Sequence, residues 1–162
     1  MEIEKKFRVT NMPSHLEQYE TREIEQGYLC TNPVVRIRRS NDDYILTYKS
    51  KFNIDEKLLQ MASVANEIEV PLTKSGYEHL KEKIDNHLIE KTRYIIPLEP
   101  PLKAELDLFH GRLEGLYFVE VEFPDEIMAN QFTPPDWFGE DVSLDKRFGN
   151  SNLSKLDCWK EE

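Results

Sequence analysis

The sequence predicts a mainly β protein of the α+β class, in which eight antiparallel strands close into a barrel around a tunnel and short helices cover it. Charged and apolar residues alternate in short runs rich in Val, Ile, Tyr and Phe, and this period of two is typical of strands with one apolar face. Neighbouring runs are joined by connections of hairpin length. The 162 residues contain no repeat, low-complexity tract or linker, so we expect a single domain over residues 1–162.

The eight runs are expected to form strands in chain order. Residues 41–43 (Asn-Asp-Asp) predict a hairpin turn between two of them, and residues 111–115 lie in a second connection of hairpin length. Neighbouring strands are therefore expected to be antiparallel. The predicted strands are residues 2–8, 23–29, 34–39, 44–51, 66–72, 90–97, 103–108 and 116–123.

One longer helix is predicted over residues 73–91. Leu80, Ile84, Leu88 and Ile89 recur there at helical spacing, behind a threonine that can cap the first turn. Shorter helices are predicted at residues 14–19, 57–63, 125–132 and 151–159. We expect these helices to cover the barrel ends, with the one at 151–159 covering one mouth of the tunnel.

Composition excludes several classes of function. The formal net charge is −10, and nucleic acids or anionic membranes are bound through basic surfaces, so neither is expected as a partner. No apolar run is long enough for a transmembrane helix or a signal peptide. Cys30 and Cys158 lie far apart without disulfide or metal-site spacing, which fits a reducing cytoplasm. A homodimer is left open.

Paired charges lie on one face of seven predicted strands. Same-face neighbours on a strand are about 6.6–6.8 Å apart, so two glutamates can lean onto one cation. Sets of oxygen ligands of this kind suit hard ions such as Mg²⁺ or Mn²⁺. The same-face residues are Glu2, Glu4, Lys6 and Arg8; Arg36 and Arg38; Lys49 and Lys51; Glu67 and Glu69; Lys91 and Arg93; Glu105 and Asp107; Glu120 and Glu122.

On any single strand such charges are ordinarily a solvated outer face. Here the opposite faces are apolar in nearly every strand, and they must pack against something. If they point outward under the helices, the charged faces line the tunnel, where eight strands leave room for one small ligand. Buried charges need partners, so carboxylates and cations together indicate an oxygen-rich anion bridged by a divalent metal, and polyphosphate fits best. The apolar residues expected to point outward include Ile3, Phe7, Val35, Ile37, Ile45, Ile68, Val70, Leu106, Leu108, Val119, Val121 and Phe123.

The first strand contains Glu2-Ile3-Glu4-Lys5-Lys6, which matches the Glu-x-Glu-x-Lys motif of the CYTH superfamily, also called triphosphate tunnel metalloenzymes. The chain resembles that family from residue 2 to about residue 150. It departs from the family pattern in lacking an Arg close before Glu67 and in residues 145–150, where Tyr and Ser are expected. Further matches lie at residues 26–29, 35–38, 46–49, 67–72, 91–94, 105–109, 115–123 and 139–143.

The resemblance implies a role for each charged residue of the tunnel. Lys91 is implied as a general base with Tyr28 as its partner, and the alternative is that Lys91 only binds phosphate. Lys146 or Arg147 is expected to reach a phosphate from the tail. The implied ligands of the main metal are Glu2, Glu4 and one of Glu120 and Glu122. The implied second-metal or water-positioning residues are Glu67, Glu69, Glu105 and Asp107. The implied phosphate-binding residues are Lys6, Arg8, Arg36, Arg38, Lys49, Lys51, Lys91 and Arg93.

The resemblance also implies an activity. It is a triphosphatase that uses Mg²⁺ or Mn²⁺ to hydrolyse inorganic triphosphate, or another linear triphosphate, to orthophosphate and diphosphate. Class IV adenylate cyclases and thiamine triphosphatases share the scaffold, and a fold alone does not choose among them. No segment supplies an evident adenine pocket, which favours the triphosphatase over the cyclase. A noncatalytic polyphosphate-binding module is a further alternative, and the retained carboxylates count against it.

Overall fold

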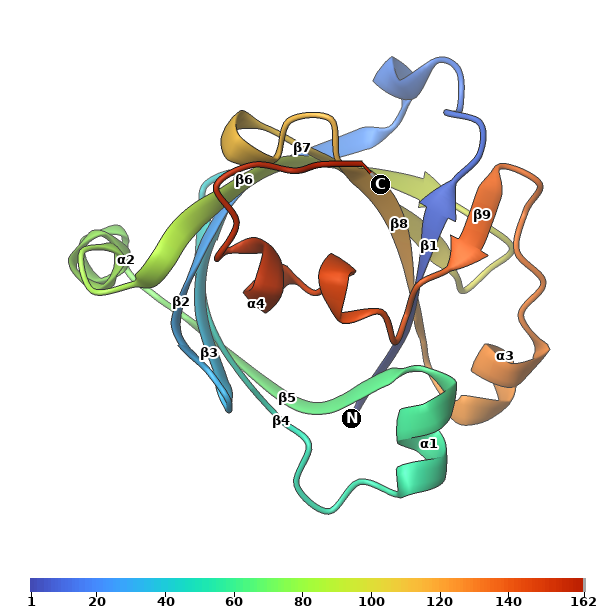
Figure 1. The fold of residues 1–162 in the computed structure, drawn as a ribbon, viewed down its shortest axis with the longest axis horizontal. Helices are drawn as coiled ribbons and strands as arrows, with labels where there is room; N and C mark the ends of the chain where they lie inside the picture. Colours follow the sequence, from blue (N-terminus) through green and yellow to red (C-terminus); the bar gives the residue numbers. More distant parts are fainter. Residues whose placement is uncertain (162) are drawn as a thin grey trace.

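The computed structural model describes residues 1–161, and its central feature is a closed ring of antiparallel strands (Figure 1). The ring runs in the order β1-β5-β4-β3-β2-β6-β7-β8 and closes because β1 pairs with both β5 and β8. A ninth strand, β9 (Phe138–Asp141), pairs with β1 from outside the ring. The ring strands are β1 (Glu2–Val9), β2 (Glu20–Thr31), β3 (Val34–Ser40), β4 (Asp43–Ser50), β5 (Ser63–Pro71), β6 (Asp85–Pro97), β7 (Lys103–Phe109) and β8 (Tyr117–Phe123).

The ring order places β1 and β2 on opposite sides of the lumen, since four strand positions separate them in either direction (Figure 1). All eight predicted strands are confirmed, together with the predicted antiparallel barrel. The turn at 41–43 joins β3 to β4, where Ser40 pairs with Asp43 and Asn41 takes the left-handed conformation that this residue type tolerates. The connection at 111–115 joins β7 to β8 as a short 3₁₀ turn, η2 (Gly111–Leu113).

Short helices lie outside the ring between strands. Each of the three α-helices outside the ring begins after an aspartate or a threonine, because these side chains accept a hydrogen bond from an unpaired backbone N–H of the first turn. The capping residues are Asp55, Thr73 and Asp125. No helix among residues 1–161 has the length and apolar character needed to cross a membrane. The elements are η1 (Leu16–Gln18), α1 (Glu56–Met61), α2 (Lys74–Lys81) and α3 (Glu126–Gln131).

The predicted helix over 73–91 is wrong beyond its first half. The helix ends at Lys81, and β6 begins at Asp85, which pairs with Tyr28 of β2. Leu88 and Ile89 therefore lie in a strand. Four apolar residues at this spacing fit a helix, but they also fit a strand that is apolar on part of both faces. In this segment the pairing with β2 decides the conformation.

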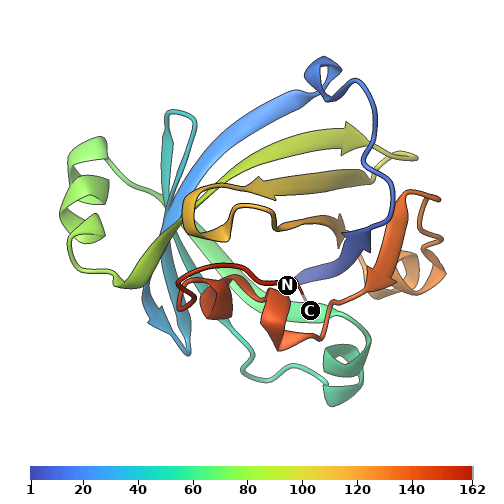
Figure 2. The ribbon, with the colours of Figure 1, turned by 45° about the horizontal axis from the view of Figure 1, so that its top comes forward.

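The larger hydrophobic core lies between the outer faces of β1, β7 and β8 and the segments that cover them. The ring of Phe7 lies 5.0 Å from that of Phe138 and 6.0 Å from that of Phe132, which flanks α3. Burying an apolar side chain of this size contributes about 1.5–3 kcal/mol. Figure 2 shows α3 and β9 on this flank and α2 on the opposite one. Here the apolar strand faces point outward, as predicted, and the charged faces point into the lumen.

The prediction that the apolar outer face is covered is wrong on β5. Ile68 and Val70 are 61% and 44% exposed. On the neighbouring β4, Ile45 does not point outward: it lines the lumen, because it shares the parity of Thr47 and Lys49. The covering helices therefore shield the outside of the ring unevenly.

The C-terminal segment closes one end of the barrel (Figure 1). It contains η3 (Lys146–Phe148) and α4 (Asn150–Leu153), whose buried Phe148 and Leu153 pack on Phe109 and Phe118. The predicted helix at 151–159 is only one short turn that begins at Asn150. The segment that contains this turn lies across one end of the ring (Figure 1). The lumen is therefore a cavity with one closed, apolar end.

Candidate active site

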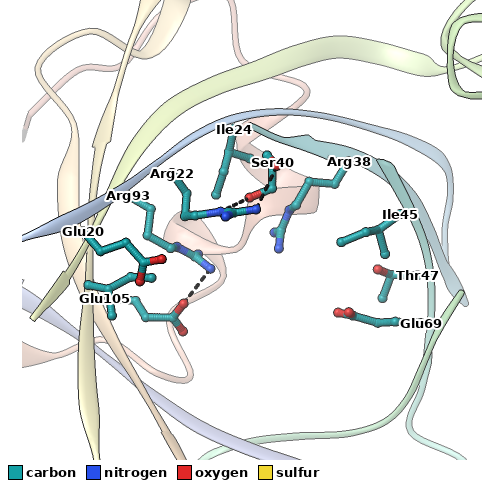
Figure 3. Close-up of a pocket in the computed structure, with 11 residues that line it drawn as sticks. Glu20, Arg22, Ile24, Arg38, Ser40, Ile45, Thr47, Glu69, Arg93 and Glu105 are labelled. Carbon is teal, nitrogen blue, oxygen red and sulfur yellow. Dashed lines mark hydrogen bonds and ion pairs between the residues drawn. The ribbon is translucent and has the colours of Figure 1, made fainter. Parts of the chain in front are cut away.

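The open part of the lumen is a polar cavity of about 270 Å³. Its lining comes from six ring strands, and Figure 3 shows arginine and glutamate side chains converging on the same space. The cavity lies at the end of the barrel opposite the C-terminal segment. Phe109 and Tyr28, which pack with that segment, lie at one end of β7 and β2, and the cavity residues of these strands lie toward the other end. The lining residues are Glu20, Arg22, Ile24, Arg38, Ser40, Ile45, Thr47, Glu69, Arg93, Ile95 and Glu105.

One wall of the lumen is acidic. Glu2 and Glu4 alternate along β1, and the register places Glu4 beside Glu122 of β8 and Lys6 beside Glu120. These carboxylates repel one another. Burial, with Glu120 and Glu2 nearby, raises the pKa of Glu4 well above its usual value. Burial likewise raises the pKa of Glu122, and negative charge on Glu2 adds to the effect. A wall of this kind is stabilised by a cation.

Lys49 is the cation that pairs with Glu2 of this wall. Its Nζ lies 2.8 Å from Glu2 Oε1 and 3.2 Å from Glu67 Oε2. Burial opposes the charge on Lys49, but Glu4 and Glu2 outweigh it and raise the pKa of the ammonium. Within residues 1–161, no group of three or more His, Cys, Asp or Glu side chains forms a ready-made metal site. The donors are nevertheless all carboxylate oxygens, and Mg²⁺ is commonly held by one or two carboxylates together with the phosphates of a substrate.

The opposite wall is basic and lacks matching carboxylates. Arg36 donates to the hydroxyl of Thr47 at 3.3 Å, and Arg38 donates to the side-chain oxygen of Gln26 at 2.9 Å. Among the described residues, neither arginine has an ion-pair partner, and the buried Arg36 Nε and Gln26 Nε2 have no hydrogen-bond acceptor. Burial and the nearby Arg36 and Arg93 lower the pKa of Arg38. These donors are arranged for an anion, because unpaired buried donors are costly.

The two walls are joined by a buried ion cluster centred on Asp107. Its carboxylate forms an ion pair with Lys91, whose Nζ lies 2.8 Å away, and accepts hydrogen bonds from Arg93 Nε and Nη2 at 2.8 and 2.9 Å. Arg93 also pairs with Glu105 at 2.9 Å and lies 3.7 Å from Glu120. Burial opposes ionisation of Asp107, but Arg93 and Lys91 outweigh it and lower the pKa of the carboxyl. Arg93 is thus neutralised by the protein itself, unlike Arg36 and Arg38.

Lys91 is fully buried in this cluster. Burial lowers its pKa to about 7; Asp107 opposes this shift, and Arg93 and Arg38 add to it. Its Nζ also lies 5.4 Å from the centre of the Phe109 ring. Tyr28, the predicted partner of Lys91, is buried at the closed end against Ile89 and Phe109. The partnership stays a prediction.

Several predicted phosphate-binding residues lie away from the open cavity. Lys6 donates to the carbonyl of Phe148 at 2.6 Å and lies over the Phe118 ring. Arg8 forms an ion pair with Glu161 at the closed end. Lys51 follows the last residue of β4 and is exposed, and Lys146 is exposed on η3. These four therefore lie outside the open cavity, and the predicted residues that line it are Arg38, Glu69, Arg93 and Glu105.

The structure adds lumen residues that sequence reasoning missed. Arg22 and Glu20 line the open cavity because β2 begins at Glu20 rather than at residue 23. Their signal was present: both share the parity of Gln26 and Tyr28, which also face inward. Thr47 is not among the predicted lumen residues because it carries no charge, although it lies between Ile45 and Lys49 on the same face.

Comparison with known proteins identifies the family. No family model matches the chain. The inorganic triphosphatases of Nitrosomonas europaea and Acetivibrio thermocellus are each 35% identical to it over 156 residues, covering 94% and 95% of this chain and 96% and 93% of theirs. The crystal structure of the inorganic triphosphatase NE1496 superposes with a TM-score of 0.66, covering 95% of this chain and 94% of that one.

A more distant neighbour shares the fold alone. It is a putative adenylyl cyclase from Hippeastrum described as having a dominant triphosphatase activity, and it superposes with a TM-score of 0.52 at 16% identity, covering 80% of this chain and 83% of that one. The near-full-length similarity at 35% identity, the eight-stranded closed barrel and the Glu-x-Glu-x-Lys strand agree with one another. The chain belongs to the CYTH superfamily of triphosphate tunnel metalloenzymes.

Proposed function

We propose that this protein hydrolyses inorganic triphosphate to orthophosphate and diphosphate inside its barrel, with Mg²⁺ or Mn²⁺ as cofactor. The observation that carries the proposal is the division of the lumen into a carboxylate wall on β1 and β8 and an arginine wall on β3. The first wall would hold a divalent ion and the second would hold the triphosphate, so that both sets of charges would be satisfied. Two full-length relatives named inorganic triphosphatases support this substrate.

The arginine wall binds the phosphate groups and orients them in the lumen. Arg36 and Arg38 have free N–H donors that can bind phosphate oxygens, and they orient the chain of phosphates along the wall. Carboxylates such as Glu2 and Glu4 would hold a divalent ion, which would supply positive charge against the charge that develops on the departing diphosphate. The closed end limits the access of bulk water, so these charges act in a low-dielectric space.

Lys91 is the residue we assign to proton transfer. A water molecule attacks the terminal phosphorus, the new P–O bond forms as the bridging P–O bond breaks, and the proton of the water passes to the neutral Nζ of Lys91. Asp107, 2.8 Å away, stabilises the ammonium that results. The alternative, in which Lys91 only binds phosphate, differs in its kinetics, because loss of a base lowers kcat and loss of a ligand raises KM.

The lining of the open cavity distinguishes this proposal from a cyclase. Within the described part of the chain, that lining contains Arg, Glu, Ser, Thr and Ile but no Phe, Tyr or Trp. A nucleobase is commonly held by stacking on an aromatic ring, and no such ring is available here. Thiamine triphosphate also carries aromatic rings, so the same lining favours the inorganic substrate.

The test measures phosphate and cyclic AMP release from inorganic triphosphate, ATP and thiamine triphosphate, each with Mg²⁺ or Mn²⁺. We expect rapid, metal-dependent orthophosphate release from inorganic triphosphate. The control is the double variant Glu2→Gln/Glu4→Gln, in which release should be lost, beside Glu17→Gln on the exposed η1 turn, in which it should persist. Cyclic AMP from ATP with little hydrolysis of inorganic triphosphate would overturn the proposal in favour of a cyclase. Silence on all three substrates would favour a binding module.

A further inference from the structure

Arg22 is an arginine of the open cavity that the reaction described above does not use. Its side chain reaches from β2 across Ile24 to the end of β3, where Nε donates to the hydroxyl of Ser40 at 2.8 Å and Nη2 to the carbonyl of Ser40 at 2.9 Å (Figure 3). Nη2 also pairs with Asp43 on the β3–β4 turn. Nη1 donates in none of the hydrogen bonds found among residues 1–161, so one edge of the guanidinium is available to a ligand.

The position of Arg22 continues the arginine wall toward the open end. The inner face of β3 carries Arg36, Arg38 and Ser40 in turn. At the third of these positions β3 therefore offers a serine and not an arginine. Successive inward residues are about 6.6–6.8 Å apart, so the guanidinium held at Ser40 extends the wall by one such step. β2 stands opposite β1 in the ring, and Arg22 therefore faces the carboxylate wall.

The charge of Arg22 remains available, unlike that of Arg93. The register pairs the two arginines directly across β2 and β6. Arg93 is tied to the buried Asp107 and to Glu105. Among residues 1–161, the only carboxylate paired with Arg22 is that of Asp43, whose side chain is 68% exposed. An ion pair with so exposed a partner is weak and screened. Ser40 and Asp43 thus hold the guanidinium in place without cancelling its charge.

We propose that Arg22 determines specificity in this reaction by binding the phosphate group that lies nearest the open end of the barrel. The inference rests on the proposed function. In inorganic triphosphate that group is a free terminal phosphate with more than one ionised oxygen, which a guanidinium binds well. In ATP the same place holds a singly charged ester phosphate followed by a ribose, which offers Arg22 less charge. Arg22 therefore favours the inorganic substrate over organic triphosphates.

The test compares kcat/KM for inorganic triphosphate and for ATP in Arg22→Gln. Where ATP turnover is too slow to follow, its inhibition constant against inorganic triphosphate replaces it. A lost hydrogen bond to a charged group corresponds to about 10- to 100-fold, so we expect that loss for inorganic triphosphate, mostly in KM, with less than about a 3-fold change for ATP. The matched control is Arg112→Gln, since Arg112 is half-exposed and pairs with the exposed Asp157 outside the lumen.

A second variant separates phosphate binding from a role in holding the turn. Asp43→Asn removes the competing carboxylate, so KM for inorganic triphosphate should fall or stay unchanged if Arg22 binds phosphate. If Arg22 only anchors the turn, Asp43→Asn and Arg22→Gln should raise KM alike, and that result would overturn the inference. Equal losses for both substrates in Arg22→Gln, or no loss, would also overturn it.

Failure of the proposed function has a different signature. If the wild-type protein releases no phosphate, titration calorimetry with inorganic triphosphate and Mg²⁺ measures the Kd directly. A Kd raised about 10-fold or more in Arg22→Gln, with ATP binding little changed, would support the role of Arg22 without catalysis. An unchanged Kd would overturn it.

Discussion

Leu153 tests whether the C-terminal segment is a packed closure of the barrel. Its side chain is 1% exposed and packs in the closed-end cluster with Phe148. Leu153→Ala removes three carbon groups, about 2.4 kcal/mol at ~0.8 kcal/mol for each. The cavity left behind adds to this loss, and Leu→Ala changes in well-packed cores cost about 2.7–5.0 kcal/mol. Because the cluster lies at one end of the barrel and can partly collapse, we expect about 2.5–4 kcal/mol.

Urea denaturation of Leu153→Ala measures this loss. With a slope of about 2 kcal/mol per molar urea, a loss of 3 kcal/mol lowers the midpoint by about 1.5 M. The control is Leu144→Ala in the same segment, since Leu144 is 55% exposed and its truncation should change the unfolding free energy by less than about 0.5 kcal/mol. A loss below about 1 kcal/mol for Leu153→Ala, comparable to that of the control, would refute the idea that the segment is packed into the barrel end.

Two further changes test the ion cluster, and a third tests the ion pair between Glu25 of β2 and Lys81 of α2. Lys91→Arg keeps a cation that cannot accept a proton. In steady-state assays of phosphate release, kcat should therefore be at least ~100-fold lower and KM little changed. A raised KM alone would instead assign phosphate binding to Lys91. Asp107→Asn leaves Lys91 without its carboxylate, and urea denaturation should show a loss of about 3–5 kcal/mol; a loss under about 1 kcal/mol contradicts the ion-pair account. Burial opposes ionisation of Glu25, but hydrogen bonds from Lys81 and Tyr77 outweigh it and lower its pKa. A lowered folded pKa gives stability that is present above the unfolded value of about 4.3 and lost as pH falls through the folded value. The difference in unfolding free energy between wild type and Glu25→Gln should therefore shrink from about pH 5 to about pH 3, and a constant difference would count against this contribution.

The barrel was predictable because the strand period is strong. On β1 and β8, charged and apolar residues alternate almost without interruption, and the outer core around Phe7 follows from that pattern. The lumen carboxylates and the basic residues Arg36 and Arg38 follow from the same parity. Residue type and position within a strand were enough to assign their direction.

The errors lie where neighbouring strands override the local sequence. The segment after Lys81 has helical spacing, yet it becomes β6 because long pairing with β2 satisfies its backbone hydrogen bonds. The missed start of β2 hid Arg22, whose direction follows at once when the strand begins at Glu20. Strand ends are set by pairing partners, which a single sequence does not display.

The closed end was the least predictable part of the site. The sequence shows apolar residues in the tail, but their docking on Phe109 and Phe118 depends on contacts between distant segments. Lys6 and Arg8 share the inner face of β1 with Glu2 and Glu4, so parity placed all four in the lumen, and the resemblance implied that Lys6 and Arg8 bind phosphate. In the structure, Lys6 and Arg8 reach the tail at Phe148 and Glu161 instead.

A crystal structure with Mn²⁺ and a triphosphate analogue whose terminal bridging oxygen is replaced by NH tests the central claim most directly. The account predicts anomalous density for Mn²⁺ in the lumen beside Glu2 and Glu4, with the phosphate groups between that density and the guanidiniums of Arg36 and Arg38. Arg22 should then contact the phosphate nearest the open end. Metal and phosphates bound only on the outer surface of the barrel, with the lumen still bridged by Lys49 as it is here, would contradict the account.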